Sequence, residues 1–260
     1  MSSSGKRMPA AFIGHGSPMN AIEPNRYVEA WQAFAASFPR PRAILCISAH
    51  WFTNMPAVTA VEQPRTIHDF GGFPKELFAV QYPAPGSPEL AREIAVLLAP
   101  DEVILDTEWG FDHGSWSVLV RMYPEADIPV VQLAVDGTEP PVVHWEFGER
   151  LTRLRDEGIL VLGSGNIVHN LRECRFDPAV QPYDWNVSFD RFVRDALERR
   201  DARALCEFAA RSDGRAAVPT PEHYLPMLYP AAMRGADEAI TTIVDGYEAG
   251  AISMYAFRVG

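Results

Sequence analysis

The chain has 260 residues, of which 47% are hydrophobic, and its formal net charge is -11. This length and hydrophobic content suit one α/β domain with a full core. The acidic balance gives no basic surface for nucleic acid or for an acidic membrane, and no segment is apolar enough to span a bilayer. A small-molecule partner is therefore favoured.

Residues 1–7 are polar, do not have the pattern of a signal peptide, and are expected to form a flexible leader in a cytoplasmic protein. A single catalytic domain is expected over residues 8–260. In that domain, short apolar runs alternate with amphipathic stretches, which predicts a central, mostly parallel or mixed sheet flanked by helices.

The predicted strands are nearly continuous in apolar character, which indicates burial on both faces of a sheet. They are residues 10–13, 43–48, 103–105, 130–134 and 159–162. Helices are predicted at residues 26–37, 87–98, 144–156 and 188–200, with a tail helix around residues 201–211. Residues 69–88 are rich in glycine, proline and aromatic residues, and they are expected to form a long ordered loop with a function.

Five of the seven histidines lie in short segments of small and turn residues, and several of them come directly after an apolar run. They are His15, His50, His113, His169 and His223. Ligands of open α/β sheets bind outside the carboxyl ends of the strands, so histidines that follow three different strands can meet at one edge. Imidazole is the commonest metal ligand in proteins, so this set predicts a metal and acid/base site at the strand ends.

Other residues near these segments have simpler interpretations. His68 and His144 lack a supporting motif and are expected to have ordinary surface or packing roles. Trp51 and Trp116 each come shortly after a histidine and are either core residues or walls of an aromatic pocket. Asp112 is either a turn residue or a carboxylate that orients an imidazole.

The five histidine segments together resemble one known family. They are residues 14–18, 48–51, 112–116, 163–170 and 220–226. They look like the class III (LigB-type) extradiol ring-cleavage dioxygenases, and more narrowly the branch that includes plant and bacterial DOPA 4,5-dioxygenases. The similarity spans nearly the whole chain, and its motifs occur in family order. It implies a sheet flanked by helices with one divalent metal ion at its edge, which binds a catechol and dioxygen.

The resemblance also implies the metal ligands. His15 and His50 would be two of them, and His223 would be a third. Many class III enzymes instead hold Fe(II) with two histidines and a carboxylate, and Glu222 directly precedes His223. Either member of this pair therefore remains open as the third ligand.

The roles of the other site residues follow from the same resemblance. His169 would be the acid/base residue close to the metal, or a fourth ligand in a resting zinc form. His113 would hydrogen-bond the substrate or an oxygen-derived intermediate. Phe73, Tyr224 and Trp51 are expected to contribute to the substrate pocket.

The expected activity is cleavage of a DOPA-like or caffeate-like catechol by dioxygen, with Fe(II) as the working metal and Zn(II) as an alternative bound ion. A neutral imidazole, with a pKa of about 6.5, can accept the proton that a catechol loses. Two alternatives stay open: a zinc-dependent hydrolase that uses the same histidines, and a non-enzymatic binding protein on this scaffold. The sequence leaves the choice between monomer and dimer open.

Overall fold

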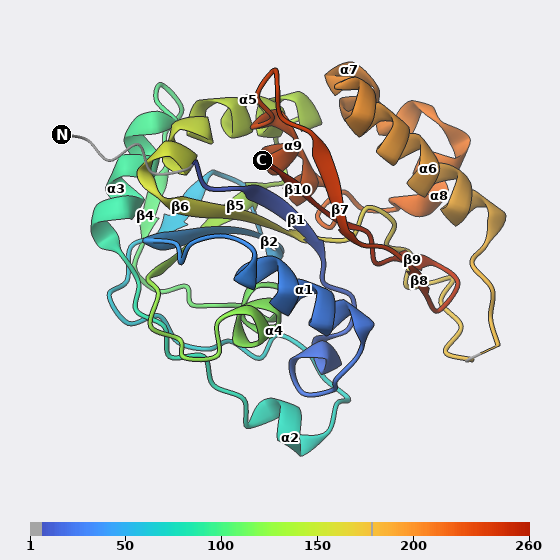
Figure 1. Ribbon diagram of the computed structural model, residues 1–260, viewed down its shortest axis with the longest axis horizontal. Helices are drawn as coiled ribbons and strands as arrows, with labels where there is room; N and C mark the ends of the chain where they lie inside the picture. The colour runs from blue at the N-terminus through green and yellow to red at the C-terminus, as the bar shows by residue number, and fades with distance from the viewer. Residues whose placement is uncertain (1–6, 178) are drawn as a thin grey trace.

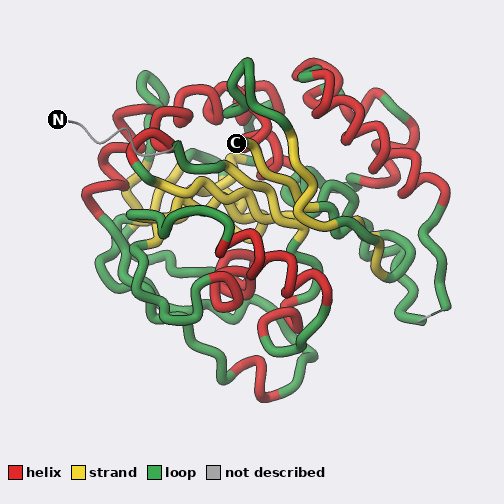
Figure 2. The backbone as a smooth tube through the Cα atoms, in the orientation of Figure 1, coloured by secondary structure: helices red, strands yellow, loops and turns green. Residues whose placement is uncertain are grey.

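The computed structural model describes residues 7–177 and 179–260, so the leader expected at residues 1–7 lies outside the described residues except for Arg7. In the described part, an eight-stranded sheet has the order β4-β3-β5-β2-β6-β1-β10-β7. Figures 1 and 2 show this sheet at the centre, with helices on both of its faces. The predicted single α/β domain with a mixed sheet flanked by helices is confirmed.

Four neighbouring strands form the parallel centre of the sheet. They are β5 (Val130–Asp136), β2 (Ala43–Thr53), β6 (Ile159–Gly165) and β1 (Ala10–Gly14). Each is almost entirely buried, as expected for apolar strands covered on both faces. Because the four strands run in the same direction, their carboxyl ends lie at the same edge.

Strands in both orientations complete the sheet at its two ends. β10 (Ala256–Val259) pairs antiparallel with β1 and with β7 (Ile240–Val244). At the other end, β3 (Ala57–Thr59) pairs antiparallel with β5 and parallel with β4 (Ile104–Asp106). A separate two-stranded sheet joins β8 (Tyr247–Glu248) to β9 (Ile252–Ser253).

The strand predicted at residues 103–105 exists as β4, but the prediction that it is buried on both faces was wrong. Ile104 is 43% exposed and Leu105 is 40% exposed. β4 is the last strand of the sheet, so it has only one strand beside it. An apolar run of three residues does not distinguish such an edge strand from a central one.

The helices lie in two layers. Figure 1 shows α1 and α4 on one side of the sheet and α5 and α9 on the other. No helix among residues 7–177 and 179–260 has both the length and the apolar character needed to cross a membrane. The helices are α1 (Arg26–Ala36), α2 (Lys75–Phe78), α3 (Pro88–Leu97), α4 (His113–Met122), α5 (Pro141–Leu151), α6 (Asp184–Arg199), α7 (Ala202–Cys206), α8 (Ser212–Ala217) and α9 (Leu228–Ala232), with short 3-10 helices at Pro18–Ala21, Thr152–Glu157, Phe208–Ala210 and Leu225–Met227.

The four predicted helices at residues 26–37, 87–98, 144–156 and 188–200 correspond to α1, α3, α5 and α6. α5 begins earlier than predicted because Pro141 occupies its first turn, where a missing N–H costs little. The tail helix expected around residues 201–211 is divided into α7 and a 3-10 helix. The predicted loop at residues 69–88 contains the short α2, and α4, α8 and α9 were not predicted.

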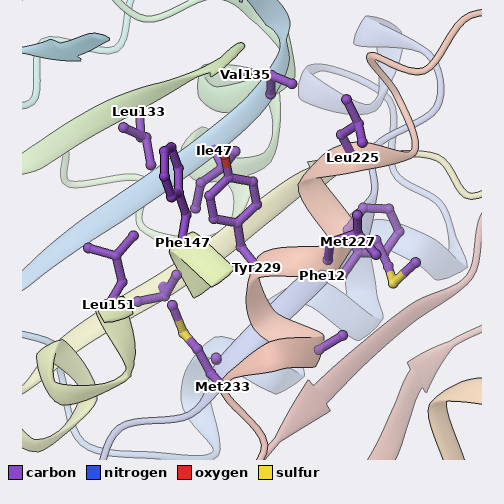
Figure 3. Packing of buried hydrophobic residues seen from close by; sticks show 14 of the residues in the cluster. Phe12, Ile47, Leu133, Val135, Phe147, Leu151, Leu225, Met227, Tyr229 and Met233 are labelled. Carbon is purple, nitrogen blue, oxygen red and sulfur yellow. The ribbon is translucent and has the colours of Figure 1, made fainter. Parts of the chain in front are cut away.

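Two hydrophobic clusters pack against the two faces of the sheet. Along β1, Phe12 belongs to one cluster and Ile13 to the other, as the alternation of side chains along a strand requires. Figure 3 shows part of the first cluster, where Phe147 of α5 and Tyr229 of α9 pack together above the strands. This packing covers one face of the central strands.

His144 has a packing role between α5 and α9. It is fully buried on α5, and its Nδ1 lies 2.9 Å from the hydroxyl oxygen of Tyr229. Burial is the main cause that lowers the pKa of His144 to about 4.

We expect this histidine to make the stability of the metal-free protein depend on pH. In the unfolded chain its pKa returns to about 6.5. Between the two values the unfolded state binds more protons, so stability is lost as the pH falls. Each pH unit corresponds to about 1.4 kcal/mol, so the difference in unfolding free energy between wild type and His144→Gln should shift by about 2 kcal/mol between about pH 7.5 and about pH 5, against the wild type. Urea unfolding measures this shift, and a difference that stays constant with pH would contradict it.

Candidate functional site

Two histidines meet where the central strands end. His15 directly follows β1, and His50 lies near the end of β2, where the pairing with β5 becomes irregular. The Nε2 atoms of the two imidazoles are 3.3 Å apart. β6 lies between β1 and β2, so the parallel order of the sheet brings these side chains together from positions 35 residues apart.

Two more histidines reach the same point from loops. His223 comes from the turn before the 3-10 helix Leu225–Met227, and its ring centroid lies 5.4 Å from that of His15 and 5.0 Å from that of His50. His169 follows β6 and stacks on His223, with centroids 3.5 Å apart and planes inclined by 10°. Ligand atoms of His15, His50 and His223 all lie within 4.8 Å of one another.

Glu222 lies on the outer side of this cluster. Its Oε1 is 3.2 Å from Nδ1 of His223. Its carboxylate forms a close group with His169 and His223, whereas the close group that contains His15 and His50 has His223 as its third member. Glu222 therefore lies next to the imidazole of His223, whereas His223 itself lies close to both His15 and His50.

His113 is the first residue of α4, and its ring centroid lies 3.7 Å from that of His50. Asp69 holds it in place: Oδ1 accepts a hydrogen bond of 2.9 Å from the His113 backbone N–H, and Oδ2 lies 2.9 Å from His113 Nδ1. The same Oδ2 lies 3.4 Å from Nδ1 of His50. One carboxylate thus faces two imidazoles.

Burial dominates the electrostatics of the cluster. It holds the pKa of His15 and of His223 well below the ordinary value, and it lowers the pKa of His50 to about 3 and that of His169 to about 4. These four imidazoles are therefore neutral near pH 7 and keep a free lone pair. Burial raises the pKa of the Asp69 carboxyl, but hydrogen bonds and charge from His113 lower it more, so its net pKa is below the ordinary value.

The donor set fits a divalent cation. Nδ1 of His15 contacts a serine hydroxyl, and Nδ1 of His50 and of His223 each lies near a carboxylate, so Nε2 is the nitrogen of each ring that can turn to an ion. Two nitrogens that each lie about 2.1 Å from one ion, at angles of about 90 to 110°, are about 3.0 to 3.4 Å apart. The 3.3 Å between the Nε2 atoms of His15 and His50 is in this range.

Residues 9–258 match the family described as the catalytic LigB subunit of aromatic ring-opening dioxygenase. The chain belongs to the LigB family. A protein of Escherichia coli K12 named 4,5-DOPA dioxygenase extradiol is 50% identical over 261 residues, which cover 99% of this chain and 96% of that relative. A Beta vulgaris protein of the same name is 37% identical over 258 residues, covering 95% of this chain and 94% of the relative.

A solved structure agrees with this membership. The crystal structure of an uncharacterized protein from Escherichia coli K12 superposes with a TM-score of 0.87 at 46% identity, and the match covers 98% of this chain and 100% of that one. This LigB chain is therefore an extradiol ring-cleavage dioxygenase of the DOPA branch, as the histidine segments predicted. LigB-type dioxygenases use a metal, and the histidine cluster is a group that can hold one.

Two residues expected in the substrate pocket of this LigB enzyme pack elsewhere. Tyr224 is fully buried in the core, where its hydroxyl donates a 2.9 Å hydrogen bond to the Leu205 carbonyl and its ring packs on Phe208. Trp51 is also buried, stacked on Trp109 with planes inclined by 6°. Each is the immediate neighbour of a cluster histidine. Trp51 lies on β2, where successive side chains point to opposite faces, and Tyr224 lies in the helical backbone conformation that begins the 3-10 helix Leu225–Met227. This packing does not support substrate contact by these two residues, which stays an untested prediction.

Phe73 is connected to the cluster through Phe70. Its ring packs edge-on against Phe70, with centroids 5.3 Å apart, and Phe70 in turn lies 5.5 Å from the ring of His113. Phe70 belongs to the loop predicted at residues 69–88, and its aromatic ring lies beside a cluster histidine.

Asp112 has the turn role that was one of its two interpretations. It caps the N-terminus of α4 by accepting from the Ser115 backbone N–H, and its carboxylate also accepts from Ser48 and Gln132. The carboxylate that faces both His50 and His113 is instead Asp69, which the sequence did not single out. The one sequence signal for Asp69 was its position at the start of the loop expected to have a function.

Proposed function

We propose that this dioxygenase opens the ring of a catechol at one divalent metal ion held by His15, His50 and His223. The observation that carries the proposal is the pair of Nε2 atoms that face each other 3.3 Å apart, with a third imidazole within reach. The catechol is proposed to be DOPA-like or caffeate-like, which agrees with the name 4,5-DOPA dioxygenase extradiol that two relatives bear.

Fe(II) is the proposed working ion. When bound, Fe(II) supplies the one-electron chemistry that allows dioxygen to react with a catecholate. Zn(II) suits the same imidazoles but has no redox chemistry, so it is proposed as a bound form without ring-cleaving activity. Buried neutral imidazoles support either ion, because a protonated imidazole has no lone pair for a metal.

His169 is proposed as the base that accepts a proton from a catechol hydroxyl. Its low pKa keeps it neutral near pH 7, and stacking on His223 holds it beside the proposed ligands. A neutral imidazole within hydrogen-bond reach of the hydroxyl can take the proton and later return it. The alternative role of His169 is that of a fourth ligand to zinc, which its closeness to Glu222 and His223 also supports.

His113 is proposed to act on the substrate through the ring nitrogen that does not face Asp69. Asp69 accepts a hydrogen bond from the backbone N–H of this residue, and its Oδ2 lies 2.9 Å from Nδ1, so this side of the ring faces the carboxylate. A preorganised donor next to the reacting oxygens stabilises the charge that builds up on them. Phe70 packs edge-on beside His113 and, with Phe73, offers an aromatic wall to a planar ring.

The proposal predicts a difference between metals. Protein reconstituted anaerobically with Fe(II) should consume oxygen with DOPA or caffeate and release a yellow ring-opened product, while Zn(II) protein should not. An oxygen electrode and absorbance spectra measure both. No oxygen uptake by Fe(II) protein of verified metal content, across a broad panel of catechols, would contradict the proposal. Metal-dependent hydrolysis without oxygen consumption would favour the hydrolase alternative.

Two further expectations stay predictions: a single catalytic domain over residues 8–260 and a cytoplasmic location. The oligomeric state is left open between a monomer and a dimer. The proposed partners are a small catechol and dioxygen. Nucleic acid is not expected as a partner, because the net charge of the chain is -11.

A further inference from the structure

Ser164 lies near the end of β6, fully buried, and its hydroxyl contacts the ring of His15. Its Oγ is 2.9 Å from Nδ1 of His15, and it donates a hydrogen bond of 2.5 Å to the Gly114 carbonyl. A hydroxyl has one proton, and a carbonyl oxygen only accepts. Because the proton of Ser164 points to Gly114, Ser164 must accept from His15. The ring proton of His15 is therefore on Nδ1.

The position of this proton determines what the other nitrogen can do. In the neutral ring a proton on Nδ1 leaves the lone pair on Nε2, which is the atom 3.3 Å from Nε2 of His50. In the opposite tautomer, Nε2 would carry the proton and could not bind a metal. We propose that Ser164 is a positioning residue that fixes His15 in the Nδ1–H tautomer and so prepares Nε2 for the metal. The metal part of this inference rests on the proposed function.

The residues that follow Ser164 hold the same part of the site from the backbone. The Gly165 carbonyl accepts a 3.0 Å hydrogen bond from the backbone N–H of His15, and the Asn166 backbone N–H donates one of 2.9 Å to the His223 carbonyl. A Cβ on Gly165 would lie 2.2 Å from that carbonyl oxygen, so only glycine allows the two segments to approach this closely. Backbone hydrogen bonds thus fix the segments that carry His15 and His223. The Ser164 hydroxyl then determines which ring nitrogen of His15 carries the proton.

A buried hydroxyl can also serve packing alone, and Ser115 provides a matched comparison. It is as buried as Ser164, and its Oγ lies 2.6 Å from Gln132 Oε1 and 2.8 Å from the Asp112 carbonyl oxygen, so its one proton goes to one of these two acceptors. No imidazole is among these partners. Ser115→Ala therefore removes an equally buried hydroxyl that does not contact His15.

The tautomer is directly measurable in the metal-free protein. Two-bond proton–nitrogen NMR spectra of protein labelled at its histidines should show His15 as the Nδ1–H tautomer in the wild type and in Ser115→Ala. Ser164→Ala should shift His15 toward the Nε2–H form, and Ser164→Thr, which keeps the hydroxyl, should restore the Nδ1–H form. A wild-type His15 in the Nε2–H form would overturn the inference without any variant. An unchanged tautomer in Ser164→Ala would also overturn it.

Zn(II) affinity gives the second readout. Competition with a chelator should show Ser164→Ala weaker than wild type by about 10- to 100-fold, as for other residues that orient a ligating histidine. Ser115→Ala should stay close to wild type, and an equal loss in both variants would mean that Ser164 acts only through packing. The NMR experiment uses no metal and no catechol, so it decides the role of Ser164 even if Fe(II) protein cleaves no catechol.

Discussion

His15→Ala and His50→Ala are expected to lose the metal and, with it, ring cleavage. Each substitution removes one of two nitrogens that face each other at 3.3 Å. The loss of metal affinity should exceed the about 10- to 100-fold that removal of an orienting residue costs, because a direct ligand is gone. Metal content after anaerobic reconstitution with Fe(II), measured by elemental analysis, checks this result.

A matched control for these variants is His144→Gln. His144 is as buried as His15, but its Nδ1 bonds to Tyr229 in the layer of helices, outside the cluster. This variant should bind as much metal as the wild type. If His15→Ala or His50→Ala kept a full complement of metal, that residue would not be a ligand.

His113→Ala is expected to have the opposite pattern, with metal retained and turnover lost. Its ring lies beside His50 but is outside the group formed by His15, His50 and His223. Loss of a positioned proton donor typically lowers the rate by about 100- to 10,000-fold. Metal content and the steady-state constants kcat and KM, measured on the same sample, separate the two effects.

Asp69→Asn tests the same interaction from the other partner. Its amide can still accept from the His113 backbone N–H, but it no longer offers a carboxylate to the two Nδ1 atoms. We expect a smaller loss of kcat than in His113→Ala, with metal retained. Turnover of His113→Ala equal to that of the wild type would remove His113 from the reaction.

Much of the fold was predictable because burial on both faces leaves a clear apolar signal. The strands at residues 10–13, 43–48 and 159–162 became β1, β2 and β6, and their shared direction explains why His15 and His50 meet. β4 was harder, because its short apolar run is the same whether it lies at the edge or at the centre. α4 was missed although Asp112 caps it, because an aspartate followed by histidine and glycine also fits a turn.

The site was predictable in its residue types and less so in its geometry. The order of the histidine segments identified the family, but the direction of a side chain next to a histidine depends on the local backbone. Tyr224 therefore packs in the core, while its neighbour His223 reaches the cluster. Asp69 faces His113 across a sequence separation of 44 residues, and no spacing rule reports such a contact. Ser164 lies inside the histidine segment at residues 163–170, but its role depends on which partner takes its single proton.

The central claim is that dioxygen opens a catechol ring at a metal held by the histidine cluster. The most direct test is to supply dioxygen labelled with heavy oxygen to Fe(II)-loaded wild type, with His15→Ala treated in parallel, and to record the mass of the ring-opened product. We predict that the wild-type product carries label from dioxygen and that the variant forms none. A ring-opened product without label, or a labelled product formed equally well by His15→Ala, would contradict the account.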